Sequence, residues 1–153
     1  MAALFFDSSS LVKRYATETG TNWVFNLVRP PAGNRLYLAR ITGVEVIAAL
    51  TKRMRVGSLT NKAAAKAVTR FEREFSNRYV LVETTPQIIR TAMDLAKRYT
   101  LRGYDAVQLA SALQANQDRI TIGGAPLTFI SADNYLNIAA TAEGLTVDNP
   151  NNH

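Results

Sequence analysis

Short apolar runs alternate along this chain with longer segments in which apolar residues recur every three or four positions. Side chains alternate in direction along a strand and repeat about every 3.6 residues along a helix, so the short runs predict buried strands and the longer segments predict amphipathic helices. The predicted strands cover residues 2–6, 36–39, 79–82, 127–131 and 145–147. The predicted helices cover residues 10–16, a segment from Thr19 or Thr21 to Val28, residues 42–53 and 60–77, a segment after Pro86, and residues 105–115 and 134–143.

The order of these elements predicts an α/β fold. Strands that alternate with helices form a mainly parallel sheet, here of roughly five strands, with helices on both faces. No linker or repeat divides the chain, so we expect a single domain over residues 1–148 and a flexible polar tail over residues 149–153. Ligands of such sheets bind beyond the carboxyl ends of the strands, where the strand order reverses. Asp7 and Asp133 each come just after a predicted strand and suit that position.

Composition agrees with a compact globular protein and excludes some kinds of site. Of the 153 residues, 47% are hydrophobic and 20% are charged, which is enough for a buried core. Cysteine is absent, which excludes disulfides, thiolate metal sites and a cysteine nucleophile and favours a reducing compartment. No stretch is long enough to span a bilayer, and the apolar start is too short for a signal peptide. We therefore expect a soluble, cytoplasmic protein.

Basic residues outnumber acidic ones, and the excess is concentrated in one segment. The formal net charge is +6, and residues 52–78 hold eight Lys and Arg residues against two acidic residues. A basic stripe suits a polyanion, because neutralising phosphates releases counterions. A solvated helix face and the rim of a protein interface are the alternatives, and for a charge run alone we favour the solvated face.

Missing residue types narrow the choice of reactions. His153 is the only histidine and lies in the polar tail, so we expect neither a Ser-His or Cys-His relay nor histidine metal ligation. Gly123 and Gly124 precede a strand rather than a helix, so they do not form a phosphate-binding glycine loop. Asp7 has the position of an aspartyl-phosphate nucleophile, but Ser9 stands where a haloacid-dehalogenase-type phosphatase carries its second aspartate.

Four acidic residues lie against apolar runs, and they are Asp7, Glu45, Asp105 and Asp133. A carboxylate beside a core is costly unless hydrogen bonds, cations or a metal satisfy it. Taken singly, each acid has a structural explanation as a helix cap or as part of a capping box, the latter for Asp105 with Gln108 and for Thr42 with Glu45. Taken together, the four predict a divalent-metal site, and oxygen ligands select Mg²⁺ or Mn²⁺.

Four segments also resemble a known family. They are MAALFFDSSSLVKRYATETG, TGVEVIAAL, LRGYDAVQLASALQA and FISADNYLNIAATAEGLTVDNP, in this order. With this spacing the chain resembles the PIN-domain ribonucleases, in particular the VapC-like toxins of toxin-antitoxin pairs. The most specific features are Asp-Ser-Ser after the first strand, Asp-Ala at the start of a buried helix, and Ser131-Ala132-Asp133 after a late strand.

The resemblance implies a PIN-like three-layer α/β/α fold and a divalent-metal-dependent endoribonuclease that hydrolyses RNA as the toxin of such a pair. The implied catalytic and metal-binding residues are Asp7, Glu45, Asp105 and Asp133, with Ser9 and Ser131 as supporting residues. Mg²⁺ is the implied cofactor, with Mn²⁺ as its substitute. The implied partners are the RNA substrate, a cognate antitoxin and a second copy of the chain in a homodimer.

Contacts with the substrate are the least constrained part of this hypothesis. Arg102 lies near Asp105 in the sequence and could touch a phosphate, while Lys13 and Arg14 could line the mouth of the site. Solvated helix-end charges are the alternative that the sequence alone favours for all three. A non-catalytic RNA-binding or protein-interaction module on a PIN-like fold is the competing hypothesis for the whole chain. Such a module would bind RNA in a salt-dependent way without metal-dependent turnover.

Overall fold

The computed structural model describes all 153 residues and has an element at each position that the sequence predicts. The strands are Ala3–Phe6 (β1), Arg35–Ala39 (β2), Val80–Val82 (β3), Thr128–Ile130 (β4) and Thr146–Asp148 (β5). The α-helices are Ser8–Leu11 (α1), Thr21–Val28 (α2), Thr42–Arg55 (α3), Asn61–Asn77 (α4), Pro86–Tyr99 (α5), Gly103–Thr121 (α6) and Asn134–Ala142 (α7). Short 3-10 turns cover Val12–Arg14 (η1), Pro30–Ala32 (η2) and Pro150–Asn152 (η3).

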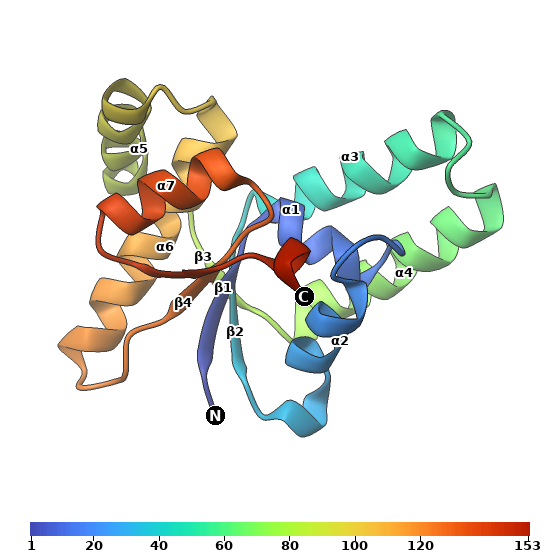
Figure 1. The fold of residues 1–153 in the computed structure, drawn as a ribbon, viewed down its shortest axis with the longest axis horizontal. Helices are drawn as coiled ribbons and strands as arrows, with labels where there is room; N and C mark the ends of the chain where they lie inside the picture. Colours follow the sequence, from blue (N-terminus) through green and yellow to red (C-terminus); the bar gives the residue numbers. More distant parts are fainter.

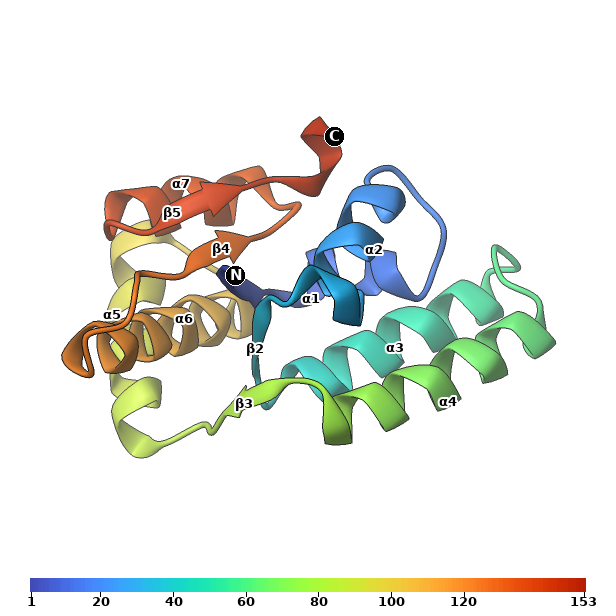
Figure 2. The ribbon, with the colours of Figure 1, turned by 90° about the horizontal axis from the view of Figure 1, so that it is seen from below.

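The five strands form one sheet in the order β3-β2-β1-β4-β5, and every neighbouring pair is parallel (Figure 2). β1 is central because it pairs with β2 on one side and β4 on the other. The chain builds the sheet outward from β1 to β3 and then returns to place β4 beside β1. The strand order therefore reverses between β1 and β4, and the predicted α/β fold with a parallel sheet is confirmed.

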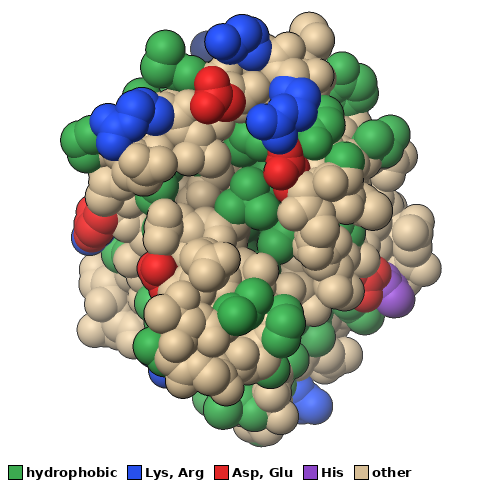
Figure 3. Space-filling model, turned by 90° about the vertical axis from the view of Figure 1, so that its left-hand side faces the viewer, with side chains coloured by type: hydrophobic (Ala, Val, Ile, Leu, Met, Phe, Trp, Pro, Cys, Tyr) green, Lys and Arg blue, Asp and Glu red, His purple; other side chains and the backbone are tan.

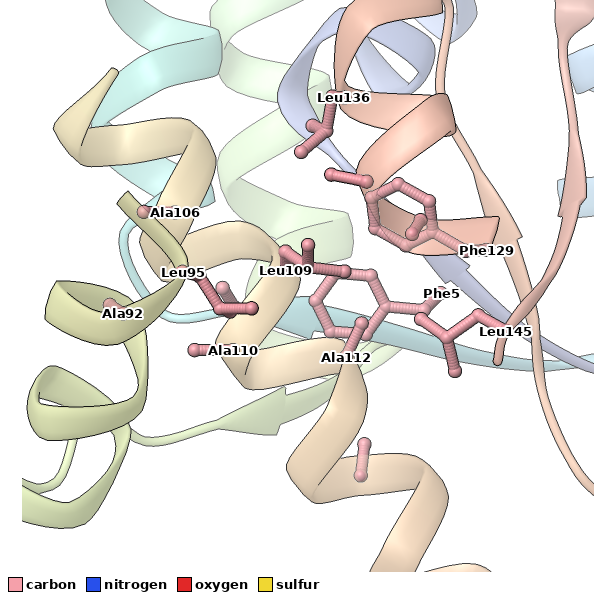
Figure 4. Packing of buried hydrophobic residues seen from close by; sticks show 14 of the residues in the cluster. Phe5, Ala92, Leu95, Ala106, Leu109, Ala110, Ala112, Phe129, Leu136 and Leu145 are labelled. Atoms are coloured by element: carbon pink, nitrogen blue, oxygen red, sulfur yellow. The ribbon is translucent and has the colours of Figure 1, made fainter. Parts of the chain in front are cut away.

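Helices cover both faces of the sheet, with α5, α6 and α7 on one face and α1 to α4 on the other (Figure 1). Successive residues of β1 point to opposite faces, as expected for a strand. Phe5 packs with Leu109 and Phe129 in the core under α6, as Figure 4 shows, while Phe6 packs in the core under α1, α3 and α4. An apolar sequence on both faces of β1 thus supports its central position.

The helices α3 and α4 form a long pair that extends beyond the edge of the sheet (Figure 1). The start of α3 lies against the end of α4 because Gly43 has no side chain. A Cβ atom at that position would lie 2.9 Å from Cζ of Phe75, closer than real Cβ contacts. This close packing fixes the first turn of α3, which carries Glu45.

The tail that we expected to be flexible forms η3 and folds back onto α2. Asn149 and Pro150 are buried, and the ring of His153 stacks on Trp23 with their centroids 4.2 Å apart. None of the helices is long and apolar enough to cross a membrane.

Candidate functional site

The carboxyl ends of β1 and β4, where the strand order reverses, carry two of the four acids. Asp7 follows β1 and caps α1, since its Oδ1 accepts a 2.9 Å hydrogen bond from the backbone N–H of Ser10. Asp133 follows β4 and caps α7, since its Oδ1 accepts a 3.1 Å bond from the N–H of Leu136. Parallel β1 and β4 end at the same edge of the sheet, so both side chains lie at the position where such sheets bind ligands.

Asp7 is a buried carboxylate, only 2% exposed, and forms no ion pair. Ser9 Oγ donates to its two oxygens at 2.8 Å, and Ser131 Oγ donates to Oδ2 at 2.7 Å. Burial raises the pKa of Asp7 to about 6, although hydrogen bonds from Ser131, Ser10 and Ser9 act in the opposite direction. Only hydrogen bonds stabilise this carboxylate, and no cationic side chain of the protein pairs with it.

Ser9 and Ser131, the two predicted supporting residues, join the ends of the two strands. Ser9 Oγ accepts a 3.0 Å bond from the N–H of Ala132, and Ser131 Oγ accepts a 3.1 Å bond from the N–H of Asp133. Each hydroxyl donates its hydrogen to Asp7 and accepts a hydrogen bond from a backbone N–H of the turn after β4. This network holds Asp7 at a fixed distance from the backbone that carries Asp133.

The other two acids come from helices on opposite faces of the sheet. Glu45 lies in the first turn of α3 and Asp105 in the first turn of α6. Gln108, one turn after Asp105, is 1% exposed, and its Nε2 donates to Glu45 Oε1 at 2.7 Å and to Thr42 Oγ1 at 2.8 Å. Burial raises the pKa of Glu45, the bond from Gln108 opposes this, and the charge of Asp105 adds to it. Gln108 therefore links the two helices that carry Glu45 and Asp105.

Gln108 is a site residue that the sequence analysis missed. Its spacing from Asp105 matched a capping box, but Arg102 is the N-cap of α6 and neither side chain caps the helix. The same is true of Thr42, which lies inside α3 after the N-cap Ile41. The capping-box alternatives for Glu45 and Asp105 are therefore wrong, because Thr42 is already the first residue of α3, as predicted, and α6 begins at Gly103, before Asp105.

All four acids line one cleft of about 680 Å³ at this edge of the sheet. Its other lining residues are Ser8, Ser9, Val12, Lys13, Glu18, Ala48, Ala49, Lys52, Arg53, Arg102, Tyr104 and Ala132. The four acids come from four separate segments of the chain, and the fold brings them together. Glu18 adds a further carboxylate, which is paired with Lys13 and Arg53 at 3.2 and 2.9 Å.

The three predicted substrate-contact residues lie in different surroundings. The guanidinium of Arg102, whose side chain is 82% exposed, lies 2.9 Å from Asp105 Oδ2 and 3.5 Å from Asp133 Oδ2. Lys13 lines the cleft but is buried, and its Nζ donates to Glu18 and to the carbonyl of Thr19. Arg14 does not line the cleft, because its guanidinium is buried in an ion pair with Glu74 at 2.9 Å. For Arg14 both the position at the mouth and the favoured alternative of a solvated helix-end charge are therefore wrong, and the solvated alternative is wrong for Lys13 as well.

The donor set fits a hard divalent cation bound in part through water. The cleft offers carboxylate oxygens and hydroxyls, which are the donors that Mg²⁺ and Mn²⁺ prefer. No three acidic or histidine side chains lie close enough together to ligate one ion. Mg²⁺ keeps several waters and is usually held by one or two carboxylates together with substrate phosphates, so it does not require such a group of three.

The sequence is similar to those of a known family and of named proteins. The PIN domain family matches residues 4–134. Ribonuclease VapC45 and Ribonuclease VapC49, both of Mycobacterium tuberculosis, are each 33% identical to this chain over 150 residues. The matched region covers 96% of this chain and 95% of each relative.

Solved structures share the fold at low sequence identity. PAE2754 from Pyrobaculum aerophilum matches 95% of this chain and 83% of its own, with a TM-score of 0.66 and 17% identity. FitAcB from Neisseria gonorrhoeae matches 96% of this chain and 97% of its own, with a TM-score of 0.62 and 17% identity. VapBC2 from Rickettsia felis, bound to a promoter DNA fragment, matches 96% of this chain and 98% of its own, with a TM-score of 0.62 and 12% identity. These three similarities concern the fold alone.

Proposed function

Because the chain belongs to the PIN domain family, we propose that it is a divalent-metal-dependent endoribonuclease that hydrolyses phosphodiester bonds in RNA. The observation that supports the proposal is that Asp7, Glu45, Asp105 and Asp133 all line one cleft at the switch point of the sheet. The ribonuclease names of its relatives support RNA as the substrate. The basic excess of the chain, with a net charge of +6, suits a polyanionic substrate.

In the proposed reaction the four acids bind the metal ion or orient the attacking water. Asp7 and Asp133 would hold the divalent ion directly, Asp105 would hold it directly or through water, and Glu45 would hold it or orient the attacking water. A bound divalent ion supplies positive charge that polarises the phosphoryl group and lowers the pKa of a water molecule. Ser9 and Ser131 hold the Asp7 carboxylate in place through the hydrogen bonds described above.

Arg102 is the proposed phosphate contact. Its guanidinium bridges Asp105 and Asp133 at the exposed mouth of the cleft. An exposed arginine is free to exchange a carboxylate for a phosphate, which it can bind through two parallel hydrogen bonds. When Arg102 moves to the substrate, Asp105 and Asp133 lose a competing cation and gain capacity for the metal.

We further propose that the chain is the toxin of a toxin-antitoxin pair and that it acts as a homodimer. The VapC names of the relatives support the first part, as does the likeness in fold to FitAcB and VapBC2. Co-expression with the protein encoded directly upstream tests the antitoxin, which should suppress both cleavage and growth arrest. Light scattering tests the dimer, and a monomeric mass would contradict it.

The nuclease proposal is tested with a fluorescently labelled structured RNA incubated with Mg²⁺ or Mn²⁺ or with excess EDTA. The unaltered chain should cleave only with metal, and Asp7→Asn should lower cleavage by roughly a hundredfold or more. Asp94→Asn is the matched control, because Asp94 is exposed on α5 and does not line the cleft. Cleavage in EDTA, or by Asp7→Asn at the unaltered rate, contradicts the proposal. RNA binding without turnover in any metal would favour the non-catalytic module.

A further inference from the structure

A second cleft adjoins the site along the same face of α3. It is lined by Ala48, Thr51, Lys52, Met54, Arg55 and Asn61. Ala48 and Lys52 also line the cleft that contains the four acids, so the two hollows share a wall. The two hollows meet at Ala48 and Lys52, and their linings together extend from Glu45, at the start of α3, to Arg55 at its end.

The residues of this depression form one stripe on α3. Glu45, Ala48, Lys52 and Arg55 follow each other at spacings of three, four and three residues, which places them on one side of the helix. The stripe is about 15 Å long at the rise of an α-helix. It starts at the proposed metal site and points along the α3–α4 pair, which extends away from the sheet in Figure 1.

The cations of the stripe have no partner within the protein. Lys52 and Arg55 are exposed and form no ion pair, whereas their neighbour Arg53 is paired with Glu18 at 2.9 Å. Exposed Lys62 and Lys66 of α4 are also free of ion pairs. Unpaired cations beside a hollow attract an anionic ligand, because binding costs no existing salt bridge.

We propose that this stripe of α3 is a phosphate track, along which one arm of the bound RNA strand leaves the cleft with its phosphates on Lys52 and Arg55. The inference rests on the proposed function. A strand cut inside the cleft has to pass over one of its walls, and this wall joins the cleft to unpaired cations. The small side chain of Ala48 lets the strand approach α3 between Glu45 and Lys52.

Binding can be measured apart from cleavage. All chains carry Asp7→Asn and are kept in EDTA, and the fluorescence anisotropy of a labelled single-stranded RNA is followed over a range of salt concentrations. The test variant is Lys52→Ala with Arg55→Ala. The matched control is Arg90→Ala with Lys97→Ala, two exposed residues of α5 that line neither cleft and leave the same net charge. Figure 3 shows the side of the molecule on which α5 lies, where basic side chains are scattered among acidic and apolar ones.

The test variant should bind RNA at least roughly tenfold more weakly than the control at about 0.1 M salt, because two phosphate contacts are lost. The slope of log K against log salt should fall in magnitude by about 1.4, since each contact with a single strand contributes about 0.7. If the two double variants have equal RNA affinities and equal salt slopes, the proposal of a phosphate track is wrong.

Two further outcomes separate this inference from its alternatives. A titration with polyglutamate checks for an acidic protein segment as the occupant. If the test variant loses polyglutamate binding and keeps RNA binding, the stripe serves a protein and the inference is wrong. If the unaltered chain shows no metal-dependent cleavage while the test variant loses RNA affinity, the nuclease proposal fails and the track is retained as an RNA-binding surface.

Discussion

The carboxylate of Asp7 caps a helix and also belongs to the cleft. Its Oδ1 accepts a hydrogen bond from the backbone N–H of Ser10, and Oδ2 accepts from the hydroxyl of Ser131. Asp133 caps α7 in the same way. The sequence suggested cap and catalytic residue as competing explanations for these acids. They are compatible for Asp133, because an ionised carboxylate has about four acceptor sites and its cap uses one of them. At Asp7 a metal ion would have to displace the hydrogen bond that Ser9 shares between the two carboxylate oxygens.

The raised pKa of Asp7 predicts how the stability of the metal-free chain depends on pH. Between the ordinary value of 3.8 and about 6, the folded chain keeps a proton that the unfolded chain has released. Stability therefore falls as pH rises through this window, by about 3 kcal/mol for a shift of about two pKa units. Urea unfolding in EDTA at about pH 4.5 and about pH 7.5 should show roughly 2 kcal/mol of this change, because about a third of it lies below pH 4.5.

The variant Asp7→Asn isolates this contribution, because an amide does not ionise in that range. The unfolding free energy of Asp7→Asn minus that of the unaltered chain should grow from acid to neutral pH. Asp94→Asn, which removes an exposed carboxylate on α5, should follow the unaltered chain. A difference that stays constant with pH would show that burial of the Asp7 charge does not destabilise the fold.

Gln108 is expected to position Glu45 for metal binding. Replacing it by leucine removes the hydrogen bonds to Glu45 and Thr42 while keeping a side chain of similar size. Loss of a partner of this kind typically weakens metal binding or activity by roughly 10-fold or more. Titration calorimetry with Mn²⁺ measures the affinity independently of cleavage.

Gln114→Leu is the control for Gln108→Leu, because Gln114 lies on the same helix and donates to Asp118 outside the cleft. A purely structural role for Gln108 would lower the unfolding free energy of the metal-free chain and leave the Mn²⁺ affinity unchanged. That result would reject the positioning role.

At the scale of elements, the sequence predicted the existence of each helix and strand better than its ends. The helix predicted for residues 105–115 runs as Gly103–Thr121, because its second half is polar and exposed and so lacks the apolar pattern that defined the prediction. Of the two starts predicted for α2, Thr19 and Thr21, the structure has Thr21, and the N-cap before it is Gly20, which has φ +85°. A Cβ atom at Gly20 would lie 2.3 Å from the carbonyl oxygen of Pro150, so this helix start depends on a contact with the distant tail.

The ion pair between η1 and α4 is expected to stabilise the fold rather than bind RNA. Arg14 donates to both carboxylate oxygens of Glu74, and Tyr15 also donates to Glu74. Burial raises the pKa of Glu74, but these hydrogen bonds outweigh it and hold the pKa below its ordinary value. Arg14→Met leaves the buried carboxylate with the half-exposed Arg70 as its remaining ion-pair partner and should lower the unfolding free energy by about 3 kcal/mol.

Arg70→Ala is the control for Arg14→Met, because Arg70 also contacts Glu74 but its side chain is 46% exposed. Its loss should cost less than about 1 kcal/mol. Urea unfolding measures both variants, and cleavage kinetics measure their KM for RNA. A raised KM for Arg14→Met without a loss of stability would contradict this structural role and indicate that Arg14 contacts the RNA.

At the scale of the whole molecule, the pattern of the sequence predicted a parallel sheet but not its strand order. The apolar run of β1 on both faces indicates a central strand, yet it does not say which strands lie beside it. That β4 is the neighbour of β1 depends on how the chain crosses the sheet, and this pairing brings Ser131 to Asp7. The sequence therefore suggested which acids belong together, whereas the hydrogen bonds that Ser131 makes to Asp7 and Gln108 makes to Glu45 required coordinates.

The whole chain is positively charged, whereas four carboxylates line the cleft. A net charge of +6 disfavours cations over most of the surface, so binding of Mn²⁺ depends on the local carboxylates. Mn²⁺ at about one hundred times its dissociation constant should add about 2.7 kcal/mol to the unfolding free energy, because it binds the folded chain and neutralises charge that repels within the cleft.

This increment corresponds to a rise in Tm of roughly 5–10 °C for a domain of this size, measured by calorimetry against EDTA. Asp94→Asn should show the full rise, while Asp7→Asn combined with Asp105→Asn should lose it, since two carboxylates of the cleft are removed. Potassium chloride of equal ionic strength controls for screening, which acts on every charge of the molecule. An equal rise in the double variant would place the stabilising ion outside the cleft and remove the basis for metal-dependent cleavage there.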